Sequence, residues 1–185
     1  MSRRWVIFVV VVGLAVGLDA ATKAWALSSL EPGRTVRALG GMLPMTLGFN
    51  RGIAFGLQVG GASRAVFTLL AVVVLGAAIA LYRATAMVRW GQRLALCLMC
   101  AGAVGNLVDR VLRTRGVIDF IGPYDLRFMS WPIFNLADVW VVIGTLGYAL
   151  ALWRAPHAPD GVVPTPRDSS VTGTTTESSH ESRPL

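Results

Sequence analysis

Four long apolar segments constrain the fold of this chain more than any other feature of its sequence. They run from Trp5 to Leu27, from Ala65 to Tyr82, from Leu94 to Leu112 and from Ile133 to Trp153. Each is close to the ~20 residues of helix that cross a bilayer. Because 54% of the 185 residues are hydrophobic, the sequence predicts an all-α integral membrane protein with four transmembrane helices.

Residues 28–63, between the first two apolar segments, have a different pattern. Glycines separate short runs such as Thr35–Leu39 and Met45–Phe49, which is typical of short strands and not of a fifth span. We therefore expect a small β-rich insertion over 28–63, inside a four-helix transmembrane domain over 1–155. Residues 156–185 are rich in Pro, Ser and Thr and cannot bury enough apolar surface to fold alone, so they are predicted to form a disordered tail.

The charged residues and cysteines exclude two classes of function. The net charge is +7, but the basic residues are scattered singly or in pairs, unlike the basic runs of nucleic-acid-binding patches. Cys97 and Cys100 are the only cysteines, and both histidines, His157 and His180, lie in the tail. Zinc sites need more ligands than one such pair supplies, so the cysteines are predicted to be buried in packing. No metal, cofactor or nucleic acid is expected.

Polar residues near the ends of the spans mark one end of the predicted bundle. In an alternating bundle, the ends of the first and third spans and the start of the fourth share one membrane face with the loops that join them. An ionisable group in a span costs about 2.5–3.5 kcal/mol, so it usually faces the bundle interior or a wet cavity. The residues gathered in this way are Asp19, Lys23, Asn50, Arg51, Asn106, Asp109, Arg110, Asp119, Asn135 and Asp138.

Asp119 and Asp138 are the candidate reactive pair. Neither has an obvious basic neighbour in the sequence, and both arise at the mouth of the predicted cavity. Two close carboxyls do not both ionise readily, so they share a proton and supply one acid and one base. Such a pair can hydrolyse an amide without a metal or a covalent intermediate. Asp125, near Pro123 and Arg127, is interpreted as a solvated turn residue.

The other polar residues could have a structural role and no part in catalysis. Asp19 and Lys23 are spaced i, i+4 and could simply join helices by ion pairing, and the same holds for Asp109 with Arg110. The first span, with basic residues before it and Ala24-Trp25-Ala26 near its end, also loosely imitates a cleavable signal peptide.

Three other functions compete with the aspartate pair. Lys23 with Ser28 or Ser29 could form a Ser-Lys hydrolase, although those serines follow the span in a loop without other catalytic features. A small proton-coupled transporter could use Asp19, Asp109 and Asp138 as a relay. A non-catalytic membrane chaperone would use the polar cluster for assembly only.

Five sequence blocks hold most of these polar residues: "DAATK" (19–23), "FNRGIAFG" (49–56), "AGAVGNLVDR" (101–110), "VIDF" (117–120) and "FNLAD" (134–138). In their order and spacing they resemble the lipoprotein signal peptidases, or type II signal peptidases, which are membrane aspartic proteases of bacteria. The resemblance covers about residues 5–153. The third block departs from the family, because it begins with Ala-Gly where Gly-Gly is common.

The resemblance implies roles for individual residues. Asp119 and Asp138 would be the catalytic dyad, and Arg110 would hold backbone carbonyls of the substrate. Asp19 and Lys23 would support the site near its outer rim, and the segment from Gly122 to Pro132 would be a mobile cover. The full set of substrate-binding or supporting residues that the resemblance implies is Asp19, Lys23, Asn50, Gly52, Asn106, Asp109, Arg110 and Asn135.

The resemblance also implies a substrate and a location. The substrate would be a lipid-modified prolipoprotein, cut just before its diacylglyceryl-cysteine, and the partners would be this substrate and membrane lipid, with the protein a monomer. The protein would span the bacterial cytoplasmic membrane, with both termini cytoplasmic and the active site at the extracytoplasmic face. Residues 1–155 would then be a transmembrane peptidase domain, 28–63 its extracytoplasmic β-cradle and 156–185 a cytoplasmic tail. The loop arginines show no positive-inside excess, so this orientation depends on the resemblance alone.

Overall fold

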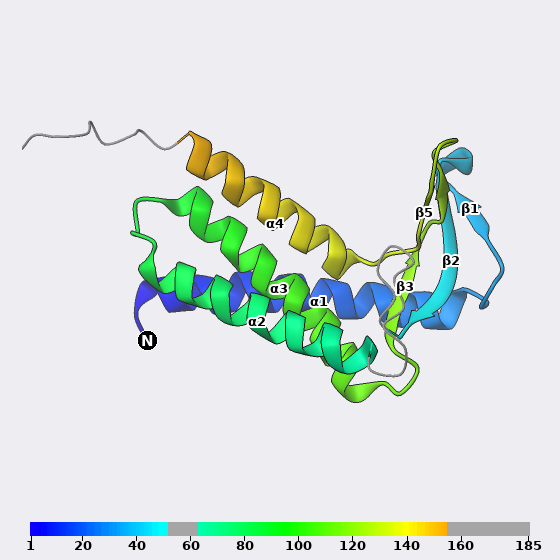
Figure 1. Ribbon diagram of the computed structural model, residues 1–185, viewed down its shortest axis with the longest axis horizontal. Coiled ribbons are helices and arrows are strands. Elements are labelled where there is room, and N and C mark those ends of the chain that lie inside the picture. Colours follow the sequence, from blue (N-terminus) through cyan, green and yellow to red (C-terminus); the bar gives the residue numbers. More distant parts are fainter. Residues whose placement is uncertain (52–62, 155–185) are drawn as a thin grey trace, which may run out of the picture. The chain divides into compact units, whose positions relative to one another are not determined.

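The computed structural model of the protein describes residues 1–51 and 63–154. In this part of the chain, four long helices lie side by side, and a small β-sheet lies at one end of the bundle (Figure 1). All four helices are long and apolar enough to cross a membrane, which confirms the predicted fold. The helices are α1 (Arg3–Ser29), α2 (Ser63–Ala84), α3 (Trp90–Leu112) and α4 (Leu136–Trp153). The tail predicted over 156–185 lies outside the described residues.

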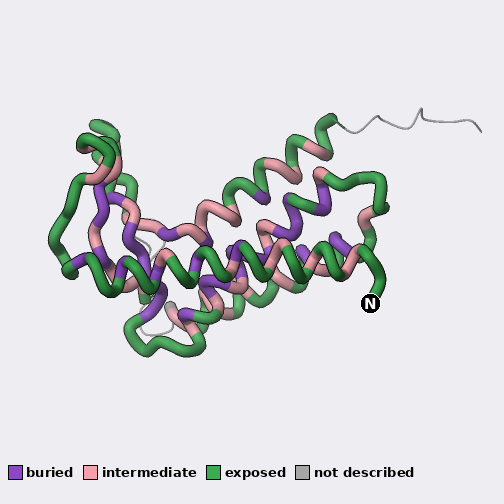
Figure 2. The backbone as a smooth tube through the Cα atoms, turned by 180° about the vertical axis from the view of Figure 1, so that it is seen from behind, coloured by how far each residue is buried: buried purple, intermediate pink, exposed green. Residues whose placement is uncertain are grey.

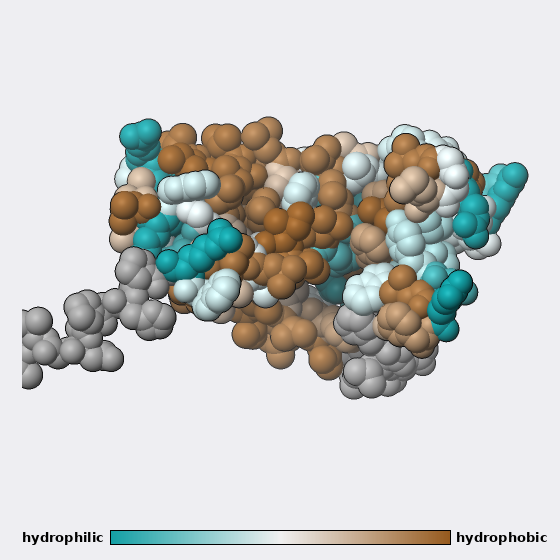
Figure 3. Space-filling model, turned by 90° about the horizontal axis from the view of Figure 1, so that it is seen from above, coloured by the Kyte–Doolittle hydropathy of each residue, from teal (hydrophilic) through white to brown (hydrophobic). Residues whose placement is uncertain are grey.

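Helix α3 is the centre of the bundle, because it packs against α1, α2 and α4 and is the most buried of the four. Its small residues, among them Ala101, Gly102 and Gly105, let neighbouring backbones approach closely. Buried stretches lie inside the bundle and along the adjoining strands (Figure 2). Hydrophobic side chains cover the middle of the helices and hydrophilic ones gather at both ends (Figure 3), as expected for a bundle surrounded by lipid.

Cys97 and Cys100 are buried in an apolar cluster between α2 and α3. Both are at most 1% exposed, and they share this cluster with Ala78, Tyr82 and Leu96. The cysteines are free thiols. The prediction that they serve packing is therefore confirmed.

The sheet joins two distant parts of the chain. Strands β1 (Val36–Ala38) and β2 (Leu43–Asn50) come from the segment between α1 and α2, where strands were predicted. Strand β3 (Val117–Ile121), between α3 and α4, pairs antiparallel with β2 and completes the order β1-β2-β3. A short 3₁₀ turn, η1 (Leu39–Gly41), links β1 to β2; its glycines have positive φ angles, which glycine adopts at little cost.

A two-stranded hairpin follows β3, with strands β4 (Tyr124–Asp125) and β5 (Ser130–Trp131). Asp125 is exposed, and its Oδ1 accepts a hydrogen bond from the backbone N–H of Arg127 at 3.0 Å. Asp125 is therefore solvated, as predicted, but it is the last residue of β4, beside the turn of the hairpin and not in it. The idea that the hairpin segment is a mobile cover stays a prediction.

Helix α4 begins at Leu136, three residues later than the predicted span, which began at Ile133. Phe134 still pairs with Ile121 in an isolated antiparallel bridge, so the chain is extended up to this point. Asn135 then caps the helix: its side chain accepts from the N–H of Asp138, whose carboxylate accepts from the N–H of Asn135. This capping box fixes the helix start. Asp138 therefore lies in the first turn of α4, not five residues inside the span.

Substitution of Gly144 tests whether α3 and α4 pack closely. A Cβ at Gly144 would lie 2.7 Å from the carbonyl oxygen of Ala95 and 2.8 Å from the backbone nitrogen of Met99. Gly144→Ala must therefore separate two backbones, and we expect it to cost about 1–3 kcal/mol. At about 2–4 °C per kcal/mol for a chain of this size, thermal unfolding in detergent measures the loss.

Gly147→Ala is the matched control on the same helix. Its Cβ would lie 3.6 Å from the Cβ of Ala95, an ordinary contact distance, so we expect little change in Tm. Equal Tm values for the two variants would contradict the close approach of α3 and α4.

Candidate active site

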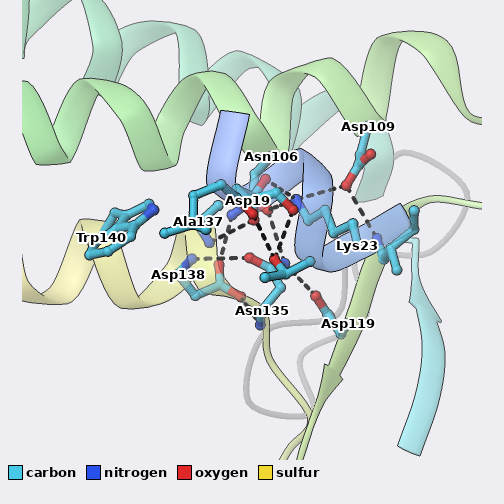
Figure 4. Close-up of polar contacts among 12 residues, drawn as sticks. Asp19, Lys23, Asn106, Asp109, Asp119, Asn135, Ala137, Asp138 and Trp140 are labelled. Atoms are coloured by element: carbon cyan, nitrogen blue, oxygen red, sulfur yellow. Dashed lines mark hydrogen bonds and ion pairs between the residues drawn. The ribbon is translucent and has the colours of Figure 1, made fainter. Parts of the chain in front are cut away.

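Strand β3 and the start of α4 bring Asp119 and Asp138 to one site. Asp119 is in the middle of β3, where it is paired with Gly48 of β2 and is 2% exposed. Asn135, fully buried, lies between the two acids (Figure 4). Its Nδ2 donates to Asp119 Oδ1 at 2.6 Å, and its backbone N–H donates to Asp138 Oδ2 at 3.1 Å. One residue therefore holds both carboxylates.

Asn106 of α3 fixes the second oxygen of Asp138. Its Nδ2 donates to Asp138 Oδ1 at 2.7 Å, whereas its Oδ1 accepts from Asn135 Nδ2 at 3.1 Å and from Lys23 Nζ at 3.5 Å. The cation at Lys23 sets the orientation of this amide, because it attracts the amide oxygen and so turns the NH₂ group toward Asp138. Both oxygens of Asp138 thus accept hydrogen bonds from fixed donors.

Lys23 is the centre of a buried charge cluster behind the two acids. Its Nζ lies 2.7 Å from Asp19 Oδ2 and 2.8 Å from Asp109 Oδ2, and all three side chains are at most 5% exposed. Asp19 Oδ1 also accepts the backbone N–H of Ala137 in α4 at 2.9 Å. The cluster therefore joins α1, α3 and α4 at the site. It lies in the interior, not at the outer rim that the sequence suggested for Asp19 and Lys23.

A cavity of about 460 Å³ borders both acids. Asn50, Asn106 and Arg110 form its polar wall together with Asp119 and Asp138. Arg110 donates from Nη1 to the carbonyl oxygen of Asn106 at 3.3 Å and interacts electrostatically with both acids. An apolar part of the lining comes from α2 and α4. The apolar wall contains Phe67, Leu70, Ala71, Val74, Val141 and Val142.

The two acids differ in their surroundings. Burial, and after it the negative charge of Asp138, raise the pKa of Asp119 from 3.8 to about 7. Hydrogen bonds from Asn135 and Asn50 and the charge of Lys23 act in the opposite direction but are weaker. Asp119 therefore holds a proton for much of the time near neutral pH, whereas the donors around Asp138 suit a charged carboxylate. The pair can supply one acid and one base.

The described residues bring together nine of the ten site residues named from the sequence. Gly52 lies outside the described residues. Asp19 and Lys23 form an ion pair within α1, and it is the ion pair of Lys23 with Asp109 that joins α1 to α3. Among the described residues, Asp109 forms ion pairs with Lys23 and Arg113 and none with Arg110. Across residues 1–51 and 63–154, no three His, Cys, Asp or Glu side chains form a group that could hold a metal ion.

The Ser-Lys alternative receives no support from the geometry. Lys23 Nζ is bound to Asp19, Asp109 and Asn106. Ser28 Oγ is exposed and donates to the carbonyl oxygen of Trp25 at 2.9 Å. The lysine is therefore engaged as a buried cation, and the hydroxyl is committed to the helix backbone.

Sequence reasoning missed three residues that support the site. Arg64, at the start of α2, donates from Nε to the carbonyl oxygen of Arg110 at 3.1 Å. Arg113 Nε lies 2.9 Å from Asp109 Oδ1, and Trp140 Nε1 donates to the carbonyl oxygen of Ala15 at 3.3 Å. The i, i+4 spacing of Asp109 and Arg113 was a usable signal, whereas nothing in the sequence indicates the other two contacts.

Comparisons with known proteins agree with this arrangement. A family model described as signal peptidase (SPase) II matches residues 11–154. A lipoprotein signal peptidase of Bifidobacterium longum (strain DJO10A) is 34% identical over 159 residues, which are 85% of this chain and 85% of that protein. Another, of Xanthomonas axonopodis pv. citri (strain 306), is 36% identical over 146 residues, which are 78% of this chain and 84% of that protein.

Two solved structures are similar to this chain over most of its length. One described as a bacterial membrane enzyme at 1.9 Å resolution matches with a TM-score of 0.70 and 28% identity, over 81% of this chain and 94% of that chain. A second, at 2.3 Å, matches with a TM-score of 0.69 and 28% identity, over 80% and 87%. With the family model matching most of its length and relatives above 30% identity, this chain belongs to the signal peptidase II family of membrane proteases.

Proposed function

We propose that Asp119 and Asp138 are the catalytic pair with which this signal peptidase removes signal peptides from prolipoproteins. The family's function is this cleavage. The observation that carries the residue assignment is that both carboxyls border one cavity and are held by the same asparagine, Asn135. Two carboxyls fixed in this way are the arrangement that general acid-base hydrolysis of an amide needs.

The surroundings of the two acids assign their roles. Asp138 is the base, because both of its oxygens accept hydrogen bonds and its place in the first turn of α4 favours negative charge. Asp119 is the acid, since burial and the neighbouring charge raise its pKa to about 7. Arg110, on the same cavity wall, holds backbone carbonyl oxygens of the substrate.

The reaction then follows from these roles. Asp138 takes a proton from a water molecule, and the water oxygen attacks the carbonyl carbon of the scissile amide while Asp119 gives its proton to the carbonyl oxygen. The tetrahedral intermediate collapses as the C–N bond breaks and the proton held by Asp138 passes to the leaving nitrogen. The proton on the former carbonyl oxygen returns to Asp119. One water is consumed, one carboxyl and one amine form, and the pair regains its starting state.

The apolar wall of the cavity is evidence that the substrate carries a lipid. Side chains of α2 and α4, including Phe67, Leu70 and Val142, line the cavity that borders the two acids. A second, almost wholly apolar cavity of about 430 Å³ adjoins it and shares Asp138 and Trp131 with it. A signal helix entering sideways from the bilayer would lie along the apolar wall, and the acyl chains of a diacylglyceryl-cysteine would occupy apolar space beside the scissile bond.

The orientation of the chain is part of this proposal. The start of α1, the α2–α3 connection and the end of α4 lie at one end of the bundle, and the sheet and the start of α4 lie at the other (Figure 1). Asp119 is in β3 of this sheet, and Asp138 is in the first turn of α4. The sheet end is extracytoplasmic in our proposal, because prolipoproteins are processed after crossing the membrane. The start of α1 and the end of α4 then both face the cytoplasm, and the enzyme acts as a monomer in the bacterial cytoplasmic membrane.

A cleavage assay tests the proposed substrate. The purified full chain in detergent is incubated with a diacylglyceryl-modified prolipoprotein, and mass spectrometry identifies the products. We expect one cut, immediately before the modified cysteine, and at least about tenfold slower cleavage of the same precursor without the lipid, since the acyl chains contribute binding. Equal rates on both precursors would contradict the role of lipid in recognition.

The pH dependence of cleavage tests the assignment of the acid. Because Asp119 must be protonated and its pKa is raised to about 7, we expect the rate to fall about tenfold per pH unit above neutrality. The native state binds more protons than the unfolded chain between about pH 4 and 7, so stability also falls as the pH rises through this window. Cleavage rates and Tm values between about pH 5 and 9 measure both; a rate still rising at pH 9 would contradict the assignment.

A further inference from the structure

A second polar site lies at the end of the bundle away from the acids. Arg93, in the first turn of α3, is 6% exposed although it is charged. Its guanidinium carbon lies 4.4 Å from the centre of the Tyr82 ring, and its Nη1 contacts the sulfur of Met87. Its Nη2 is buried and has no hydrogen-bond partner among the described residues. A buried charged donor without an acceptor costs folding free energy, so a ligand that offers Nη2 an acceptor would be stabilised there.

The protein supplies no anion for Arg93 within the part of the chain that the structure describes. No carboxylate there forms an ion pair with it. Four of the six acidic residues of that part, Asp19, Asp109, Asp119 and Asp138, belong to the candidate active site. The other two are Glu31, which follows α1, and Asp125 in the β4–β5 hairpin. The first turn of α3 also contains no acidic residue, and no side chain caps its N-terminus. The positive end of the helix therefore adds to the charge of Arg93.

Arg93 lines a cavity of about 190 Å³ between α1, α2 and α3. This is roughly six times the ~30 Å³ that a water molecule occupies in the liquid. Ile7 and Val11 of α1 and Leu94 of α3 give it an apolar side, and Tyr82 and Trp90 give it aromatic edges. Tyrosine and tryptophan gather where the headgroups of a bilayer meet its hydrocarbon. The cavity thus combines a fixed cation with apolar walls at that depth.

We propose that this cavity binds the headgroup phosphate of an anionic phospholipid. The guanidinium of Arg93, which lines the cavity, matches phosphate oxygens in shape and charge. A turn of this side chain toward the cavity would bring the buried Nη2 to the acceptor that the described residues do not provide. The acyl chains run along Ile7, Val11 and Leu94 into the bilayer. Basic pockets between transmembrane helices recognise lipid headgroups in this manner. The site is independent of the roles of Asp119 and Asp138.

Native mass spectrometry of the full chain in detergent tests this site. The protein is titrated with phosphatidylglycerol or with phosphatidylcholine of the same acyl chains, so that only the headgroup differs. We expect one phosphatidylglycerol to bind at least about tenfold more tightly than phosphatidylcholine. Arg93→Gln removes this preference, whereas Arg83→Gln, an exposed arginine at the same end, retains it. Unchanged preference in Arg93→Gln would overturn the proposal.

Two further measurements, a cavity-filling variant and a competition with inorganic phosphate, test the site even if Arg93→Gln does not fold. Ile7→Trp fills the cavity from its half-exposed side and leaves Arg93 intact, so it should weaken phosphatidylglycerol binding about tenfold even if Arg93→Gln does not fold. Wild-type affinity in Ile7→Trp would overturn the proposed cavity. Millimolar inorganic phosphate should not displace the lipid; displacement as effective as that by phosphatidylglycerol would show a site for free anions and overturn the lipid assignment. Prolipoprotein cleavage at the other end of the bundle reports folding of each variant.

Discussion

Asp138→Asn should lower prolipoprotein cleavage by at least about 10³-fold, because asparagine cannot take a proton from the attacking water. The variant should still fold, since an asparagine can accept the backbone N–H of Asn135 that Asp138 accepts now. It then presents an NH₂ group to Asn106 Nδ2, where Asp138 Oδ1 was the acceptor. We expect a stability loss of about 1 kcal/mol from this mismatch. Single-turnover cleavage and thermal unfolding measure the two effects.

Asp119→Asn should abolish cleavage to the same extent but change stability in the opposite direction. Its folded-state pKa is raised to about 7 from 3.8, so ionisation of Asp119 destabilises the folded protein as the pH rises. Asparagine has no such ionisation and keeps an oxygen for Asn135 Nδ2. We therefore expect a Tm above that of the wild type at pH 7, with a difference that shrinks toward pH 4. The opposite stability effects separate the two acids.

Asp125→Asn is the matched control, because Asp125 is exposed in the hairpin and asparagine can still accept the N–H of Arg127. Its cleavage rate and Tm should equal those of the wild type. If the polar cluster served assembly only, both Asp119→Asn and Asp138→Asn would lower the Tm. Each variant would then lose cleavage only in proportion to its loss of folded protein. Cleavage within a few-fold of wild type in either variant would remove that residue from the catalytic pair.

Much of this fold could be predicted from the sequence because its signals are long. A span of about 20 apolar residues predicts both a helix and a position in the lipid bilayer. Because four such helices alternate in direction, the polar ends of α1, α3 and α4 lie at the same membrane face. The cost of polar groups in lipid then predicts that Asp19, Lys23 and Asn106 turn inward. The structure brings them together with Asp138, as that reasoning requires.

The parts that could not be predicted depend on contacts between distant segments. Strand β3 is buried along most of its length, so its sequence lacks the alternation that reveals a half-exposed strand. Its pairing with β2 is what sets the position of Asp119. The start of α4 depended on the cap formed by Asn135, which apolar length alone does not reveal. The two ion pairs of Lys23, with Asp19 and with Asp109, could likewise not be predicted together, because Asp109 comes from a different helix.

Lys23→Met should be the most destabilising single change in the site. Lys23 lies 2.7 Å from Asp19 and 2.8 Å from Asp109, and its removal leaves two buried carboxylates that repel each other without a cation. Breaking a buried ion pair by removing one partner costs about 3–5 kcal/mol. It also releases the amide of Asn106 that faces Asp138. We expect a Tm lower by roughly 6 °C or more at 2–4 °C per kcal/mol, together with a loss of cleavage.

Two comparisons decide whether this loss arises from unpaired buried charge. Arg34→Met also removes the cation of an ion pair, but both Arg34 and Glu31 are 72% exposed, so its cost should stay within about 1 kcal/mol. The triple variant with Asp19→Asn, Lys23→Met and Asp109→Asn contains no buried charge at these positions and should regain most of the lost Tm. A triple variant as unstable as Lys23→Met would show that the lysine acts through packing of its side chain. Recovery would establish that neutralisation of the two carboxylates is what Lys23 contributes to the helix junction.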